Sequence, residues 1–551
     1  MTGLASLLWG DGAAPEGGLV ANSGRLELTW TNKHLTLLAG EEGGYEWVDP
    51  GDVRVAETRL LDEVATVGRV GATTQRAADN LLIRGDSLHA LRSLARLPEY
   101  ARELVGKVKL IYIDPPFNTG QAFANYDDAL EHSVWLTMMR DRLVELKRLL
   151  SPEGTIWVHL DDAEVHRMRS VMDEVFGPAS FLSSIVWEKA DAVLNNNTRF
   201  SPNHDLISVY GDPNWTANRL PRTEAMNEIY TNPDDDPRGR WFAGPFTVPG
   251  FRQNQQYPIT NPAGETFTPP RSRSWYCTEE RFEELLQDGR IHFTKDGAGK
   301  PHLKLYLSEA KGRTVSTLWP VGEVLGNRQA KKHIIKMFPD EAPFATPKPE
   351  QLLQRIIHVA TDPGDIVLDC FAGSGTTAAV AHKMGRRWVT VERETDTVHT
   401  FTVPRLEMVV SGDEPGGITE AVGWAGGGGF RVLEVAESMY EVIADGEVLL
   451  SESATNGRFA EAVRAQLGFE VDDQPPFCGR KGRTRLAVFD GAVGVVEAEH
   501  LVGSLDKTDR LVLVAKAVDP DVEALLVERS PGSRIRKAPR DLLRSTGRVV
   551  R

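Results

Sequence analysis

Cysteine is scarce in this chain of 551 residues, which holds only Cys277, Cys370 and Cys478. No two of these thiols have the spacing of metal ligands, and scattered thiols do not make a disulfide framework. We therefore expect no metal site and a reducing, cytoplasmic location. Long apolar runs and a basic N-terminal segment are also missing. For this reason we expect neither a membrane span nor a secretory signal peptide.

Positive charge is in deficit as well. The net charge of −15 argues mildly against a general nucleic-acid binder, although this average leaves room for a local basic groove. A phosphate-binding loop of the Gly-x-x-x-x-Gly-Lys-[Ser/Thr] type is absent, and no helicase or nuclease motif is visible. Any nuclease or helicase activity must therefore come from another chain.

What is present, from Leu81 onward, is an alternation of expected strands and helices. This rhythm predicts an α/β fold with a mostly parallel sheet covered by helices. It breaks down between about 195 and 344, where Pro, Asn, Arg and aromatic residues predict a loop-rich insert. We expect strands at 109–113, 155–159, Ile366–Asp369 and 388–391, and helices at 133–150, 163–176, 351–360 and 376–384.

Five segments follow from this pattern. Residues 25–70 alternate in a β-like way, which predicts a small N-terminal module at 1–75. Residues 76–194 and 345–411 carry the α/β rhythm on either side of the insert at 195–344. Glycines 426–429 mark a break, and the segment 412–551 beyond it predicts a further α/β-like domain.

The run Asp369-Cys-Phe-Ala-Gly-Ser-Gly-Thr-Thr377 places an acid at the end of an expected strand and two glycines before a helix. Glycines let a ligand approach the backbone, and the helix N-terminus offers free N–H groups. Glu392 ends the next strand, where a carboxylate can accept hydrogen bonds from ribose hydroxyls. An ordinary strand–turn–helix connection would also fit the glycines alone. The full order of strand, acid, glycines, helix, strand and acid favours a nucleoside cofactor.

The run Asp114-Pro-Pro-Phe117 follows another expected strand. The two prolines stiffen the turn and remove two N–H donors, which leaves the Asp114 carboxylate and the Pro115 carbonyl as acceptors. Such acceptors suit an exocyclic amino group, and Phe117 offers a flat face for a base taken out of a duplex. A rigid turn closed by a core aromatic explains the motif alone equally well.

These motifs resemble the amino-group DNA methyltransferases in which the catalytic motif precedes the cofactor motif, called the β class. More narrowly, residues 80–410 resemble the adenine-specific Mod subunits of type III restriction–modification systems. The residues that carry the resemblance are Leu82-Ile-Arg-Gly-Asp-Ser-Leu88, Ile111-Tyr-Ile-Asp-Pro-Pro-Phe-Asn-Thr-Gly120, Trp135-Leu-Thr-Met-Met139, 232–241, Thr346-Pro-Lys-Pro-Glu350 and 369–377.

The resemblance implies a Rossmann-like fold that uses S-adenosylmethionine to methylate N6 of adenine in double-stranded DNA. It makes 76–194 the catalytic part, 345–411 the cofactor part and 195–344 the target-recognition insert. It further implies a homodimer and a separate helicase-nuclease partner. The implied catalytic residues are Asp114, Pro115, Pro116 and Phe117, and the implied cofactor residues are Asp86, Lys348, Asp369, Phe371, Ala372, Gly373, Gly375, Thr376 and Glu392.

Two details of the motifs bear on the chemistry, and one group of basic residues bears on DNA contact. Many relatives carry Tyr where this chain has Phe117, so the stack is kept and a hydroxyl is lost. A Pro-Cys motif for cytosine-C5 chemistry is absent, so Cys370 is expected to be a buried apolar residue. Basic residues gather between 290 and 336, and a solvated basic face competes with DNA contact as their explanation. The candidates for DNA contact are Arg313, Arg328, Lys331 and Lys332.

Three hypotheses stay open. The first is an adenine-N6 DNA methyltransferase of a restriction or phage-defence system. The second is a cytosine-N4 methyltransferase, which Asp114 disfavours because relatives of that kind more often carry Ser before the two prolines. The third is a non-catalytic recognition subunit, which the intact Asp114 and glycine loop disfavour.

Overall fold

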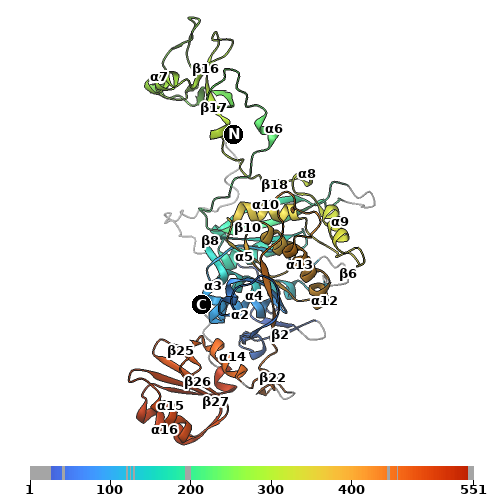
Figure 1. The fold of residues 1–551 in the computed structure, drawn as a ribbon, viewed down its shortest axis with the longest axis vertical. Helices are drawn as coiled ribbons and strands as arrows, with labels where there is room; N and C mark the ends of the chain where they lie inside the picture. Colours follow the sequence, from blue (N-terminus) through green and yellow to red (C-terminus); the bar gives the residue numbers. More distant parts are fainter. Residues whose placement is uncertain are drawn as a thin grey trace, which may run out of the picture.

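The computed structural model describes residues 26–39, 44–118, 122–123, 126–127, 131–192, 200–443, 447–455 and 457–543. It is an elongated molecule with a ten-stranded sheet in the middle and a smaller module at either end (Figure 1). None of the helices in these ranges is long and apolar enough to cross a membrane.

The central sheet has the strand order β18–β9–β10–β8–β5–β19–β20–β4–β21–β3. The strands from β8 to β21 run parallel to one another, whereas β10 and β3 are antiparallel to their neighbours β8 and β21. The α/β prediction is therefore confirmed. The strands are β3 Leu61–Gly68, β4 Asn80–Arg84, β5 Val108–Ile113, β8 Leu150–Leu160, β9 Phe181–Glu188, β10 His204–Gly211, β18 Leu318–Trp319, β19 Ile366–Asp369, β20 Arg387–Glu392 and β21 Gly429–Val435.

Helices cover both faces of this sheet, which is why its strands read as apolar runs rather than as alternating ones. In β5, Ile111 and Ile113 pack with the helices of one face, and Leu110 and Tyr112 with those of the other. The first face carries α2 Ser87–Arg96, α4 His132–Leu149 and α5 Val165–Phe176. The second carries α10 Glu350–Ala360, α11 Thr376–Lys383 and α13 Val403–Ser411.

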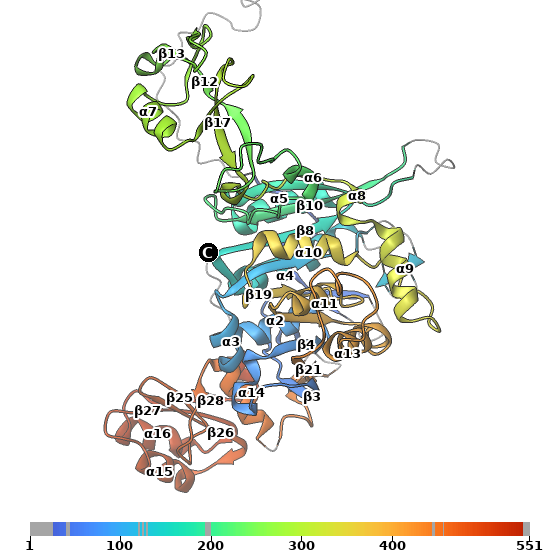
Figure 2. The ribbon, with the colours of Figure 1, turned by 45° about the horizontal axis from the view of Figure 1, so that its top comes forward.

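The outer module, residues 241–306, lies beyond the β18 edge of the sheet (Figure 2). Its core gathers aromatic side chains, among them Phe246, Tyr257, Trp275 and Phe282. Its elements are β11 Trp241–Pro245, β12 Thr247–Pro249, η3 Gln253–Gln255, β13 Ile259–Thr260, β14 Thr266–Phe267, β15 Arg273–Trp275, α7 Glu279–Gln287, β16 Ile291–Phe293 and β17 Pro301–Tyr306.

The C-terminal module, residues 458–543, holds a second sheet in the order β24–β25–β26–β27–β28. One face of this sheet has a core of its own, which includes Leu511 and Leu513. The other face and α14 contribute Leu486, Val514 and Phe459 to the apolar cluster that also contains residues of the central sheet. Its elements are α14 Arg458–Leu467, β24 Glu470–Val471, β25 Gly479–Lys481, β26 Thr484–Val493, α15 Val495–Gly503, β27 Arg510–Val518, α16 Pro520–Arg529, β28 Arg534–Lys537 and α17 Arg540–Leu543.

Shorter elements complete the described chain. They are β1 Thr36–Ala39, β2 Tyr45–Val48, α1 Val53–Ala56, η1 Thr73–Ala78, α3 Pro98–Leu104, β6 Ala122–Phe123, β7 Tyr126–Asp127, η2 Pro178–Ser180, α6 Glu224–Asn227, η4 Leu307–Glu309, α8 Val321–Val324, α9 Asn327–Met337, α12 Thr395–Thr397, η5 Val398–Thr402, β22 Tyr440–Val442 and β23 Val448–Leu450.

The predicted segment boundaries stay a prediction, but the central sheet draws strands from segments on both sides of them. β3 comes from the expected N-terminal module, β10 and β18 from the insert, and β21 from the segment that starts at 412. A sheet edge leaves backbone N–H and C=O groups unpaired, and these additional strands extend the pairing. Sequence rhythm does not reveal such pairing between distant segments.

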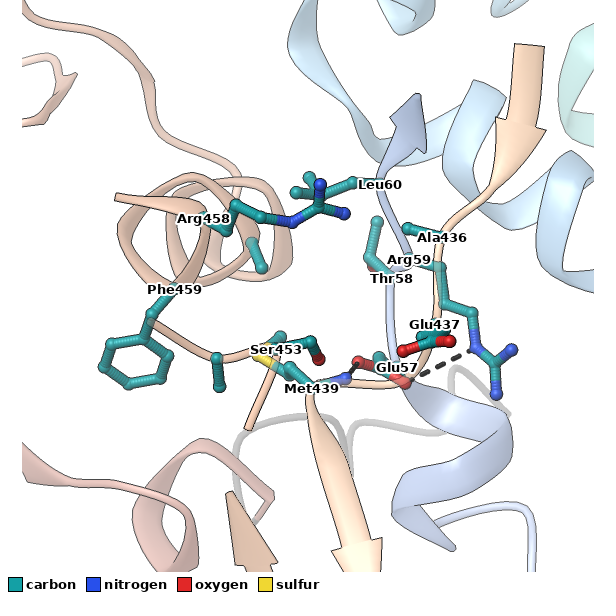
Figure 3. A pocket seen from close by; sticks show the side chains of 12 residues that line it. Glu57, Thr58, Arg59, Leu60, Ala436, Glu437, Met439, Ser453, Arg458 and Phe459 are labelled. Carbon is teal, nitrogen blue, oxygen red and sulfur yellow. Dashed lines mark hydrogen bonds and ion pairs between the residues drawn. The ribbon is translucent and has the colours of Figure 1, made fainter. Parts of the chain in front are cut away.

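A small cavity lies where the chain before β3 meets the segments after β21 (Figure 3). Glu57 accepts hydrogen bonds there from the Met439 backbone N–H at 2.8 Å and the Ser438 hydroxyl at 2.7 Å. Burial raises the pKa of Glu57. The cavity measures about 20 Å³, which is room for about one water molecule, so it is not a cofactor pocket.

Candidate active site

Four neighbouring parallel strands, β5, β19, β20 and β4, end at the same edge of the central sheet. Asp114 follows β5, Asp369 ends β19, Glu392 ends β20, and Asp86 follows β4 after one residue. Ligands of open α/β sheets bind at this carboxyl edge. The structure thus brings together the acids that the sequence places in separate motifs.

The loop after β19 is held by its own acid. Asp369 accepts hydrogen bonds from the Phe371 backbone N–H at 2.9 Å and from the Thr377 hydroxyl at 2.6 Å. Gly373 and Gly375 have φ values of 50° and 76°, in the region that side chains disfavour, so glycine is required at both positions. The loop before α11 is therefore held in one conformation by these contacts.

Glu392 closes the other side of this loop. It accepts the Gly373 backbone N–H at 2.8 Å and the Glu394 backbone N–H at 2.9 Å. Burial raises the pKa of Glu392 to about 7. Burial likewise raises the pKa of Asp369 to about 7, and the nearby charges of Asp114 and Glu392 act in the same direction. Such a pair of buried acids favours a ligand that donates hydrogen bonds and carries positive charge.

Asp114 has one oxygen engaged and one available. Its Oδ2 accepts a hydrogen bond from Lys348 Nζ at 2.5 Å, and Lys348 Nζ also lies 5.1 Å from the centroid of the Phe117 ring. Its Oδ1 is buried and has no hydrogen-bond partner among the described residues. A buried acceptor without a donor is costly, so this atom is suited to a donor brought by a ligand.

Contacts with α4 and β8 hold the turn that follows Asp114. The Pro116 carbonyl accepts the Trp135 indole N–H at 2.7 Å, and Pro115 is buried. His159, at the end of β8, lies under Phe117 with ring centroids 5.8 Å apart. The rigid turn suggested by the two prolines is thus present together with the free acceptor.

His159 belongs to a buried network that the sequence analysis did not identify. Its Nδ1 is 2.8 Å from the Tyr112 hydroxyl and its Nε2 is 3.2 Å from Asp205 Oδ2, while Lys189 Nζ donates to Asp205 Oδ1 at 2.6 Å. Burial alone would raise the pKa of Asp205, but the hydrogen bond and charge of His159 and the charge of Lys189 lower it to about 2. The sequence does hold one sign of this network, because the polar residue His159 ends the apolar strand expected at 155–159.

Comparison with known proteins now adds to this geometry. The profile of the family described as DNA methylase matches residues 108–402, which is more than half of the chain. The chain belongs to the DNA methylase family. The match includes the Asp114 turn, the insert and the glycine loop.

Three relatives illustrate this membership. The chain is 33% identical over 332 residues to the type III restriction-modification enzyme StyLTI Mod subunit of Salmonella typhimurium, a match of 54% of this chain and 49% of the relative. It is 30% identical over 423 residues to the probable HindVI Mod subunit of Haemophilus influenzae, with 65% and 54% covered. It is 28% identical over 326 residues to the type II methyltransferase M.EcaI of Enterobacter cloacae, with 55% and 66% covered. The chain thus matches about half the length of the two Mod subunits.

Both carboxylate oxygens of Asp86 are already engaged within the protein. Its Oδ1 caps α2 by accepting the backbone N–H groups of Leu88 and His89 at 2.8 and 3.4 Å, and its Oδ2 accepts Arg142 Nη2 at 2.8 Å. Burial raises the pKa of Asp86, but the charge of Arg142 and the helix N–H groups outweigh it and bring the value to about 2. The cofactor contact expected of Asp86 stays a prediction, and the observed contacts are structural.

A buried cluster of charged side chains lies behind the glycine loop. Lys383 Nζ lies 2.5 Å from Glu350 and 2.5 Å from Glu414, and Arg405 lies 2.7 and 3.0 Å from the same two carboxylates. Arg405 also donates to the Thr376 hydroxyl at 2.8 Å. Glu350, Glu414 and His333 lie close enough to hold a metal, but the two cations already neutralise the carboxylates. We read the cluster as a support for the loop.

The remaining predicted residues lie in three places, which are the glycine loop, α9 and the segment before β18. Phe371 and Ala372 belong to the loop, where the Ala372 backbone N–H donates to Val391 at 2.9 Å. Arg328, Lys331 and Lys332 are exposed on α9 and form one basic face there. Arg313 lies outside α9, 3.6 Å from Glu323, and is only partly exposed. The ligand and DNA contacts of all these residues stay predictions.

Proposed function

We propose that this DNA methylase transfers the methyl group of S-adenosylmethionine to N6 of a flipped adenine in double-stranded DNA. The observation that carries the proposal is the free, buried Oδ1 of Asp114, beside Phe117 and one strand away from the glycine loop. This arrangement places an acceptor for an amino group next to a cradle for a nucleoside.

The donors and charges of the cradle fit the cofactor. Its sulfonium is positive, which suits the buried Asp369, and its ribose hydroxyls are donors, which suit Glu392 at the end of β20. The glycine loop between β19 and α11 would take the methionine end. When bound, the cofactor supplies an activated methyl group, so no covalent enzyme intermediate is needed. The residues that would line the pocket are Asp369, Phe371, Ala372, Gly373, Gly375, Thr376 and Glu392.

The chain's own residues orient the amine. An adenine amino group has two hydrogens, and the acceptors for them are Asp114 Oδ1 and the Pro115 carbonyl. Holding both hydrogens directs the nitrogen lone pair away from the ring, and alignment of this kind supplies much of a rate enhancement. The nitrogen gains one methyl group and releases one proton. Lys348 holds the second oxygen of Asp114, and Phe117 stacks on the flipped base.

The choice of adenine, the DNA substrate and the partners rest on the motifs and the relatives. Asp114 before the two prolines favours adenine over cytosine. Two of the relatives are named Mod subunits, so we propose the modification subunit of a type III-like or related defence system. A homodimer, a helicase-nuclease partner and a cytoplasmic location are parts of the same proposal.

The test is modification sequencing of a methylation-free bacterial host that expresses the chain. We expect N6-methyladenine at one short motif, and its loss in Asp114→Ala and Asp114→Asn. Glu283→Ala, which removes an exposed carboxylate of α7, is the matched control and should leave methylation unchanged. N4-methylcytosine would overturn the choice of base. No modification by the unaltered chain, with or without a restriction subunit, would overturn the proposal.

A further inference from the structure

The outer module presents a loop whose side chains make no hydrogen bond or ion pair with the residues that the structure describes. The loop follows β12, begins at Gly250 and extends into η3 as far as Asn254. Phe251 is 70% exposed, and Arg252, Gln253 and Asn254 are exposed as well. A single exposed aromatic is common on protein surfaces. Four exposed side chains in a row that combine an aromatic ring, a guanidinium and two amides are a richer combination.

The backbone of this loop is nevertheless firmly held. Ser274 on β15 is fully buried, and its hydroxyl accepts the Arg252 backbone N–H at 2.7 Å and donates to the Gly250 carbonyl at 2.9 Å. Gln256 Nε2 donates to the same hydroxyl at 2.8 Å. Below the loop, the Trp275 indole donates to the Tyr257 carbonyl at 2.7 Å within the aromatic core. The four side chains are thus displayed from a preorganised base.

The sequence between β12 and α7 is basic, whereas the whole chain is acidic. This segment contains one acidic residue, Glu265, and three arginines, which are Arg252, Arg271 and Arg273. Arg273 is used internally, since its guanidinium donates to Thr247 at 3.0 and 2.9 Å. Arg252 and Arg271 are exposed. A basic tip on a chain of net charge −15 favours an anionic partner.

The shape of the support narrows the partner. β12 and β15 form a two-stranded antiparallel ribbon, and β12 lies farther from the central sheet than β17 does (Figure 2). The major groove of DNA admits a two-stranded ribbon, and there Asn and Gln pair with adenine and Arg with guanine. We propose that Arg252, Gln253 and Asn254 read base edges of duplex DNA and set the methylated motif. This inference rests on the proposed function, because it names the residues that choose the site.

The experiment is selection of bound sequences from a randomised duplex library by the full chain. We expect the unaltered chain to enrich one short motif. Each of Arg252→Ala, Gln253→Ala and Asn254→Ala should lower the preference at one position by about 5- to 150-fold. Gln253→Glu and Asn254→Asp keep the side-chain shape and remove a donor, so they separate reading from folding. Arg281→Ala and Gln287→Ala on the exposed face of α7 are the matched controls.

Two results would overturn the inference. One is enrichment of the same motif, to the same extent, by the loop variants. The other is an even loss of binding to all sequences, which would make the loop a backbone contact. Methyl transfer is measured separately: a chain that enriches a motif without methylating it leaves the inference standing and refutes the proposed function.

Discussion

At the scale of single residues, the contacts of Lys348 suggest that it holds Asp114 in place. The resemblance makes it a cofactor residue, yet its ammonium contacts Asp114 and Phe117. Lys348→Met keeps the length and removes the charge. We expect kcat to fall about 10- to 100-fold, since a hydrogen bond to a charged group is lost, with less than about a twofold change in cofactor Kd. Steady-state kinetics and calorimetric titration measure the two quantities.

The control for this prediction is Lys516→Met, an exposed lysine of the C-terminal module, which should behave like the unaltered chain. A cofactor Kd raised tenfold with kcat unchanged would restore Lys348 to the cofactor pocket.

We predict that Glu392 makes the binding of S-adenosylmethionine sensitive to pH. Its pKa of about 7 lies above the usual value because of burial, and ribose hydroxyls prefer its charged form. Affinity should therefore rise with pH up to about 7 and then level off, by at most about tenfold per pH unit for this group. Glu392→Gln should bind more weakly with a shallower pH dependence. Calorimetric titration between pH 6 and 8 decides this, and identical slopes in both chains would contradict it.

The same raised pKa has a consequence for stability with the opposite sign. A buried acid whose folded pKa exceeds its unfolded value stabilises the fold at low pH, and this contribution is lost as pH rises through about 7. Without cofactor, the difference in melting temperature between Glu392→Gln and the unaltered chain should therefore grow in favour of the variant from pH 6 to pH 8. Thermal unfolding at both pH values tests the sign.

At the scale of elements, the buried charge cluster joins α10, α11 and α13 behind the glycine loop. Arg405 is 1% exposed and reaches both carboxylates and Thr376. Removing one partner leaves uncompensated buried charge, so Arg405→Met should destabilise the fold by about 3–5 kcal/mol. Urea unfolding measures the loss. Arg281→Met, whose guanidinium is exposed, is the control, and equal stability of the two variants would show that the cluster supports nothing.

Elements were also where sequence reasoning worked best. Each strand and helix expected between 109 and 176 and between 351 and 391 is present within a few residues of its predicted bounds. The acids at strand ends could be found because polar residues interrupt apolar runs. His159 and Asp205 were missed, since their meeting depends on the antiparallel pairing of β8 and β10, which no local pattern encodes. The position of Lys348 over Asp114 is likewise a long-range contact.

At the scale of the whole molecule, β21 extends the central sheet beyond the predicted end of its α/β segment. It lies beyond the predicted boundary at 411, yet it pairs with both β4 and β3. A chain that ends at 411 loses this strand and leaves β3 without its neighbour. We expect it to melt at a lower temperature than a chain that ends at 443, which retains β21. Thermal unfolding compares the two, with the full chain as reference, and equal melting temperatures would contradict this role of β21.

The pairing of Gly68 with Gly429 also imposes a delay on folding during synthesis, because the two strands are far apart in the sequence. A ribosome adds about 5–20 residues per second, so β3 emerges tens of seconds before the strand that will cover it. During that interval its backbone hydrogen-bonding groups are open to chaperones, to proteases or to another nascent chain on the same message. The central sheet can therefore be completed only after most of the chain has left the ribosome.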